Sequence, residues 1–150
     1  MLEDNSGKKS KLPQGALILG SINIIFFGIL FLGYFSLYFY LRTNPEFLYK
    51  ITEIVKIKEI KTQFTYQTLQ ASIIFQLIVC SLYITGGVGV LKKKEWGRKL
   101  TVYFSLTIVV ILFLFTLLQP SLVQYTLIKA IYPGVLIWYF TNKKIIDKFS

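Results

Sequence analysis

Three polar side chains lie inside otherwise apolar stretches of the sequence, and they are the residues that could carry chemistry: Asn23, Gln76 and Lys129. A polar group buried without a hydrogen-bond partner costs free energy, so such a residue marks either a structural contact or a binding site. The ammonium group of Lys129 could attract an anionic or carbonyl group, and no Asp or Glu occurs in the same stretches to pair with it. These three residues are the candidate binding residues.

The remaining residue types argue against an enzyme. The chain has no histidine, the commonest general base and metal ligand, and its one cysteine, Cys80, cannot supply the thiol pair of quinone-linked redox chemistry. Intramembrane proteolysis by paired aspartates needs acids within the apolar stretches, and proton-coupled transport of the small multidrug type needs a glutamate there. Both are absent from those stretches. We therefore expect no catalytic residue, no metal site and no cofactor.

Four apolar stretches must position the candidate residues. Hydrophobic residues make up 54% of the sequence and aromatic residues 17%, while the charges collect between the stretches. A helix needs about 20 apolar residues to cross about 30 Å of hydrocarbon. The first stretch is too long for the apolar core of a signal peptide, so it is expected to be retained. The sequence predicts an all-α membrane protein, a bundle of four transmembrane helices at residues 14–41, 69–91, 100–118 and 122–141.

Three segments lie outside the predicted spans. Residues 1–13 are predicted to be a disordered cytosolic leader, and residues 142–150 a short basic cytosolic tail. After the first span, Asn44-Pro45-Glu46 is typical of a helix start, and apolar residues then recur at helical spacing. Residues 45–61 are therefore predicted to form an interfacial amphipathic helix in the headgroup plane; the alternative is a helical connector that packs on its own bundle.

The distribution of lysine and arginine predicts the orientation. With four spans, the leader, the middle loop and the tail share one side and carry eleven of these residues, whereas the other side carries five. Cytosolic loops hold the excess of positive charge, so both termini are expected in the cytosol. The membrane is expected to be the plasma membrane of the cell.

Basic residues beside membrane spans also account for the net charge of +10. They sit against anionic lipid headgroups, and no basic stretch is long enough for a folded nucleic-acid surface, so lipids and not nucleic acid are the expected partners. The residues expected to anchor the chain to headgroups lie between the second and third spans: Lys92, Lys93, Lys94, Trp96, Arg98 and Lys99.

The depth of the candidate residues can be counted along each predicted helix. At about 1.5 Å per residue from the cytosolic end, Asn23 lies about 14 Å deep, Lys129 about 18 Å and Gln76 about 22 Å. Lys129 could face a polar cavity or extend to the outer headgroups. Small and weakly polar residues also form a stripe on the second span, predicting either close helix packing or a solute path: Thr68, Ser72, Gln76, Cys80, Tyr83 and Gly87.

The segment from Gly87 to Leu100 joins a glycine-containing span end, a lysine-rich turn and Trp96-Gly97-Arg98 at the opening of the next span. It resembles a segment of small uncharacterised prokaryotic integral membrane proteins with four spans. The resemblance covers about a tenth of the chain, and its residues follow general anchoring physics. It implies a four-span topology in a prokaryotic plasma membrane and implies no activity.

Two classes of function fit these observations. The first is a non-enzymatic membrane protein, such as a partner, scaffold or assembly subunit, which binds another membrane protein or a second copy of itself by helix packing. The second is a small oligomeric transporter or channel with a polar path near Lys129, Gln76 and Asn23.

Overall fold

The computed structural model describes residues 12–44, 46–47, 66–118, 120 and 123–149. These residues form helices and short connections, with no strand among them, so the predicted all-α class is confirmed. The helices are α1 (Gln14–Thr43), α3 (Tyr66–Leu91), α4 (Glu95–Leu118), α5 (Val123–Phe140) and the short α6 (Lys143–Ile146).

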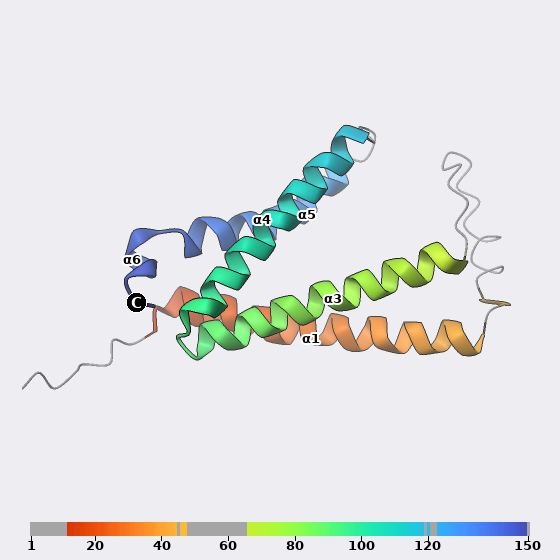
Figure 1. The fold of residues 1–150 in the computed structure, drawn as a ribbon, viewed down its shortest axis with the longest axis horizontal. Helices are drawn as coiled ribbons and strands as arrows, with labels where there is room; N and C mark the ends of the chain where they lie inside the picture. The colour runs from red at the N-terminus through yellow and green to blue at the C-terminus, as the bar shows by residue number, and fades with distance from the viewer. Residues whose placement is uncertain (1–11, 45, 48–65, 119, 121–122, 150) are drawn as a thin grey trace, which may run out of the picture.

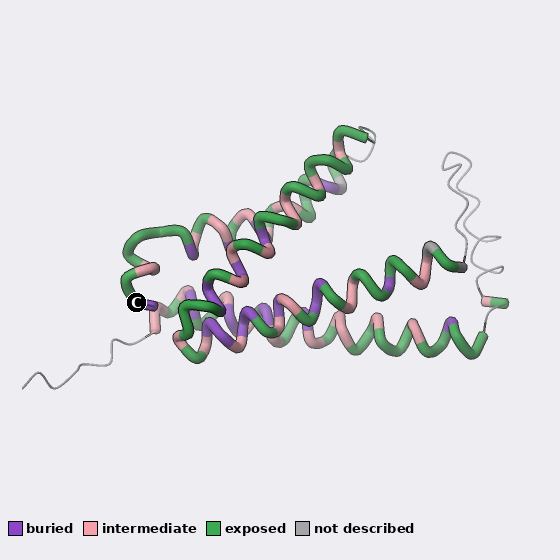
Figure 2. Tube along the Cα trace, in the orientation of Figure 1, coloured by how far each residue is buried: buried purple, intermediate pink, exposed green. Residues whose placement is uncertain are grey.

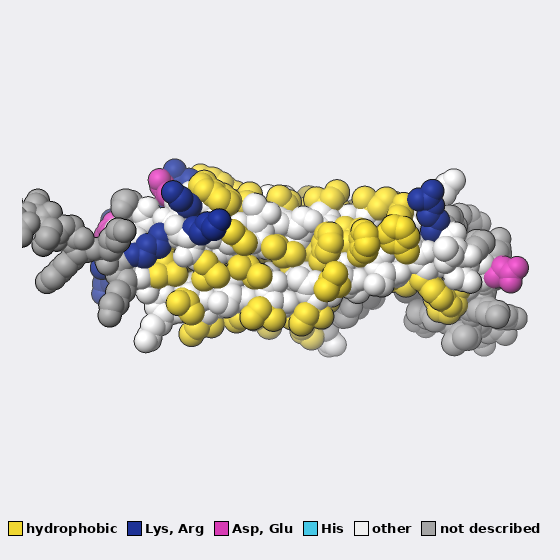
Figure 3. Space-filling model, turned by 90° about the horizontal axis from the view of Figure 1, so that it is seen from below, with side chains coloured by type: hydrophobic (Ala, Val, Ile, Leu, Met, Phe, Trp, Pro, Cys, Tyr) yellow, Lys and Arg dark blue, Asp and Glu magenta, His cyan; other side chains and the backbone are white. Residues whose placement is uncertain are grey.

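Three of the described helices, α1, α3 and α4, are long and apolar enough to cross a membrane. Helix α5 is shorter, with 18 residues, and Pro133 lies inside it. The space-filling view shows a band of apolar side chains, with basic side chains gathered near one end of the molecule and a smaller basic patch near the other (Figure 3). This distribution is compatible with a multi-pass membrane protein, because an apolar band flanked by charges matches the layering of a bilayer.

The four long helices form two antiparallel hairpins (Figure 1). The first hairpin pairs α1 with α3, and the second pairs α4 with α5. At one end, here called the junction end, α1 begins, α3 turns into α4 and α5 ends. At the other, the open end, the two hairpins have diverged.

Among the described residues, the buried core that the two hairpins share lies near the junction end (Figure 2). One cluster of buried residues there includes Phe27 of α1, Tyr83 of α3 and Leu136 of α5, with Phe104 of α4 packed against it. A second cluster is built around Leu41 and Ile73, and the described residues in it belong to the first hairpin or to Phe47. The first hairpin thus has a core of its own toward the open end.

The connection from α3 to α4 is a tight turn closed by backbone hydrogen bonds. Lys93 adopts a left-handed conformation, with φ of 54°. The amide of Lys93 donates to the Val90 carbonyl at 3.0 Å, and that of Lys94 donates to the Gly89 carbonyl at 2.9 Å. These two bonds satisfy carbonyls at the end of α3, as in a Schellman motif. Helix α4 then begins at Glu95, five residues before the predicted span, because an acid in the first turn favours a helix start.

Glycines allow α3 to approach both neighbours closely. A methyl group on Gly89 would lie 2.6 Å from the Cα atom of Gly97, so α3 and α4 cross backbone to backbone. A methyl group on Gly87 would lie 2.8 Å from the Asn23 Cβ atom, on the α1 side. The glycines at this end of α3 therefore serve helix packing, which explains their presence without a phosphate-binding loop.

The chain after α5 folds back onto the bundle instead of extending away from it. Asn142 caps α6 by accepting a hydrogen bond from the Lys144 amide at 3.0 Å. Phe149 is buried, and its ring centroid lies 6.2 Å from that of Phe140. Two apolar residues of the predicted basic tail, Ile145 and Phe149, thus join the shared core. The predicted leader, except residues 12 and 13, and the predicted amphipathic segment 45–61, except Glu46 and Phe47, lie outside the described residues.

Candidate functional site

Asn23, the candidate residue of α1, lies completely buried at the junction of the two hairpins. The Tyr132 hydroxyl of α5 donates a hydrogen bond to its Oδ1 atom. Its Nδ2 atom, which is also buried, has no hydrogen-bond partner among the described residues. The Oδ1 atom of Asn23 therefore links the first hairpin to the second, whereas its Nδ2 donor is unsatisfied among the described residues.

A second polar pair lies beside the first. The hydroxyls of Tyr83 on α3 and Ser105 on α4 are 3.4 Å apart and both residues are buried. The Tyr83 ring stacks on Phe27, with centroids 4.3 Å apart, and meets Tyr132 edge-on at 6.2 Å. Aromatic rings thus separate the two hydrogen-bonded pairs and fill the space between the four helices.

These four residues, Asn23, Tyr83, Ser105 and Tyr132, form one layer, which we call the polar layer. Each long helix contributes one of them. Counted from the junction end of each helix at about 1.5 Å per residue, all four lie about 12 to 15 Å deep. Hydrogen bonds at such a depth hold helices together and contribute about 0.6 to 2 kcal/mol each. All four side chains are neutral, so the layer suits helix pairing better than proton transfer.

The other two candidate residues are not part of this layer. Lys129 is exposed on α5, and Gln76 is half-buried on α3. No described hydrogen bond joins Asn23 to either of them. Asn23 is therefore bonded to Tyr132 and not to the other two candidate residues among the described contacts.

The predicted small-residue stripe on α3 divides along its length. Cys80, Tyr83 and Gly87 are buried at the junction, Gln76 is half-buried, and Ser72, nearer the open end, is exposed. The stripe thus packs against helices only in its junction half. The Thr68 side chain lies outside the described residues.

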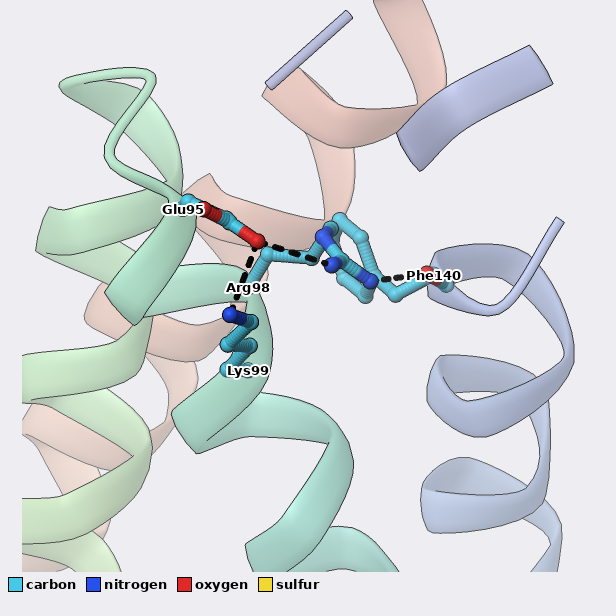
Figure 4. A network of polar contacts seen from close by, with 4 residues as sticks. All are labelled: Glu95, Arg98, Lys99 and Phe140. Carbon is cyan, nitrogen blue, oxygen red and sulfur yellow. Dashed lines mark hydrogen bonds and ion pairs between the residues drawn. The ribbon is translucent and has the colours of Figure 1, made fainter. Parts of the chain in front are cut away.

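Arg98 has a structural partner that the sequence analysis missed. Its side chain is buried, and its Nη1 atom donates a hydrogen bond of 3.0 Å to the backbone carbonyl of Phe140 at the end of α5 (Figure 4). The last carbonyls of a helix lack intrahelical donors and carry partial negative charge, so a buried cation is favoured there. Its Nη2 atom also lies 3.7 Å from Glu95. Arg98 thus ties the start of α4 to the end of α5.

The other predicted anchoring residues surround this end of the molecule. Lys92, Lys94, Trp96 and Lys99 are exposed, and Lys93 is half-buried. Lys99 forms an ion pair of 2.9 Å with Glu95 (Figure 4). Their exposure leaves them able to reach lipid headgroups, which remains a prediction for all of them.

Ser105 and Tyr132 are members of the polar layer that the sequence analysis did not single out. The available signal was their depth: Tyr132 lies eight residues from the end of α5, as Tyr83 does from the end of α3. Comparing the depths of weakly polar side chains on different spans would have placed them in one layer with Asn23.

Comparisons with protein-family models, with curated proteins and with solved structures found no match for this chain. Its function is therefore inferred from the residues and their geometry.

Proposed function

We propose that this chain is a four-span plasma-membrane protein with both termini in the cytosol, which acts without catalysis as a partner or assembly subunit of another membrane protein. One observation carries the proposal. The polar side chains buried at the junction each form a hydrogen bond within the chain, whereas no described residue of α4 beyond Ser105 is buried and the large apolar side chains there are mostly exposed.

A fourth crossing by α5 is supported by its length and direction. Its 18 residues span about 27 Å, close to the thickness of the hydrocarbon core. It runs antiparallel to α4 and returns to the junction end (Figure 1). The lysine and arginine excess of the leader, the middle loop and the tail then favours a cytosolic junction end.

The face proposed to bind a partner lies on the open half of α4. The described buried residues of α4 are Gly97, Arg98, Thr101 and Ser105, all in its first half. Beyond them, large apolar side chains recur at spacings of four and three residues and are exposed: Leu106, Val110, Phe113 and Leu117. Such a stripe fits a groove on a transmembrane helix of the partner, where association depends on van der Waals packing.

The proposal is tested with a photoreactive amino acid at Phe113, in native membranes. We expect a crosslink to one partner membrane protein, which then co-purifies with the wild-type chain at a fixed ratio. The matched control is Ile25, an apolar residue of α1 with a similar exposed fraction, 64% against 62% for Phe113. Equal crosslinking from both positions, or no co-purification, would contradict a specific partner on α4.

An oligomeric transporter is the second candidate, because a charged side chain, Lys129, is exposed on the apolar helix α5. A polar path at Lys129 would then have to form between copies of the chain. Liposomes with purified protein distinguish the two candidates. The partner proposal expects solute flux no greater than that of empty vesicles, and no change on Lys129→Leu. Flux that depends on Lys129 would overturn it in favour of transport.

A further inference from the structure

The contacts between the two hairpins are concentrated in the junction half. Side-chain hydrogen bonds join them at the polar layer, and Gly89 and Gly97 bring α3 and α4 into backbone contact nearby. Toward the open end, each hairpin has internal contacts of its own. Leu41 and Ile73 belong to one cluster in the first hairpin, and the hydroxyls of Thr116 and Thr126 lie 2.7 Å apart in the second.

We propose that the two hairpins are rigid arms that change their mutual angle within the membrane. The Gly89–Gly97 crossing is the pivot, and the Asn23–Tyr132 hydrogen bond is the catch that holds the junction closed. This device concerns how the chain moves and does not depend on the identity or existence of a partner.

The crossing suits a pivot because no side chain stands between the two backbones. Interlocked side chains resist rotation, since their packing allows few alternative arrangements. At Gly89 and Gly97 the contact is between main-chain atoms, with the Trp96 ring alongside. Small residues let two helix backbones approach this closely, so in this proposal a change of angle at the crossing need not repack large side chains between them.

The hydrogen bond that forms the catch is opposed by an unfavourable free-energy term in the closed junction. Closing forms the bond between Tyr132 and Asn23 but leaves the Asn23 Nδ2 donor buried without a partner among the described residues. An unsatisfied buried donor costs about as much as a hydrogen bond contributes. The unsatisfied donor thus offsets part of the free energy that the Tyr132–Asn23 bond contributes to the closed arrangement, so losing the bond shifts the balance toward the open one.

The test measures distances between spin labels in lipid nanodiscs, in a Cys80→Ala background that removes the native thiol. Labels at Leu32 on α1 and Leu114 on α4, both exposed, report the angle between the hairpins. Labels at Leu32 and Ile74 report the first hairpin alone. The catch is removed by Tyr132→Phe, which deletes one hydroxyl and keeps the ring.

We expect Tyr132→Phe to raise the ratio of long to short Leu32–Leu114 distances roughly three- to tenfold, the factor that matches the loss of one membrane hydrogen bond. The Leu32–Ile74 distances should not change. Thr116→Val, which removes a hydroxyl pair inside the second hairpin, is the matched control and should leave the Leu32–Leu114 distances unchanged. Unchanged Leu32–Leu114 distances in Tyr132→Phe would refute the catch, and a parallel change in the Leu32–Ile74 distances would refute rigid arms.

Discussion

The junction half and the open half of this molecule are built from similar residues but are held together differently. In the junction half, glycines let the backbones approach, and one neutral polar side chain from each long helix joins the others in a layer. In the open half, each hairpin packs on itself, and no described residue of α4 beyond Ser105 is buried. Small residues and hydrogen bonds thus determine which helices associate, because apolar side chains gain little from leaving lipid.

The largest effect is expected at the glycine crossing. In Gly97→Ala the new methyl group would collide with the backbone of Gly89, so α3 and α4 must separate. We expect a loss of about 3 kcal/mol in the free energy of unfolding, measured by denaturant titration in detergent micelles. The matched control is Gly33→Ala on α1 in the open half, where a methyl group meets nothing within 4 Å. It should stabilise the helix by up to about 1 kcal/mol. Equal changes in the free energy of unfolding for the two variants would contradict closer backbone packing in the junction half.

The next effect is expected at the buried arginine. Arg98→Gln removes the charged donor from the Phe140 carbonyl, and a hydrogen bond to a charged group contributes about 2 kcal/mol. Lys99→Gln makes the same change of charge on an exposed neighbour and should cost less than about 0.5 kcal/mol. The comparison uses the same titration. If both variants lost the same free energy of unfolding, the loss would come from the change in net charge and not from the Arg98–Phe140 hydrogen bond between α4 and α5.

A smaller effect is expected within the polar layer. A double-mutant cycle with Tyr83→Phe and Ser105→Ala should give a coupling of about 0.6 kcal/mol, typical of a hydrogen bond between membrane helices. A second cycle with Ser105→Ala and Thr116→Val crosses from the junction half to the open half. These residues are about 16 Å apart along α4, so their effects should add. Coupling in the second cycle would show that the two halves are not independent.

The smallest effect is expected in the turn. Lys93 holds a left-handed conformation that side chains rarely adopt, so Lys93→Gly should stabilise the protein by about 0.5 kcal/mol after the entropy cost of glycine. Lys94→Gly makes the same substitution at the next residue. The φ angle there is not positive, so this variant should be neutral or destabilised. The check is the unfolding midpoint of each variant, measured against that of the wild-type chain. A stabilised Lys94→Gly variant would point to charge repulsion in the turn instead of backbone strain.

The sequence predicted the helices well because their signals are local. Apolar length and flanking charges placed the four long helices within about five residues of where the structure has them, and the rarity of polar residues in the apolar stretches singled out Asn23. The partners of Asn23 and Arg98 could not be predicted in the same way. Tyr132 is 109 residues from Asn23, and Phe140 is 42 residues from Arg98. Such contacts depend on how each helix is rotated about its axis, which an almost uniformly apolar helix does not encode in its hydrophobic pattern.

The tail shows the same limit. The sequence predicted a short basic tail there, and in the structure Lys143, Lys144 and Lys148 are exposed. Phe149 nevertheless packs on the bundle, because one aromatic ring can fill a gap that only the assembled helices create. The amphipathic segment, the headgroup anchors and the cytosolic orientation remain predictions.

The separate core around Leu41 and Ile73 has a consequence for biosynthesis. Its described members are all made before α4 leaves the ribosome, so the first two helices can associate in the bilayer while the rest of the chain is still being translated. The later pair then arrives at a preassembled surface that already presents Asn23 and Tyr83. A core confined to the first hairpin thus allows the helices to assemble in the order in which they are synthesised.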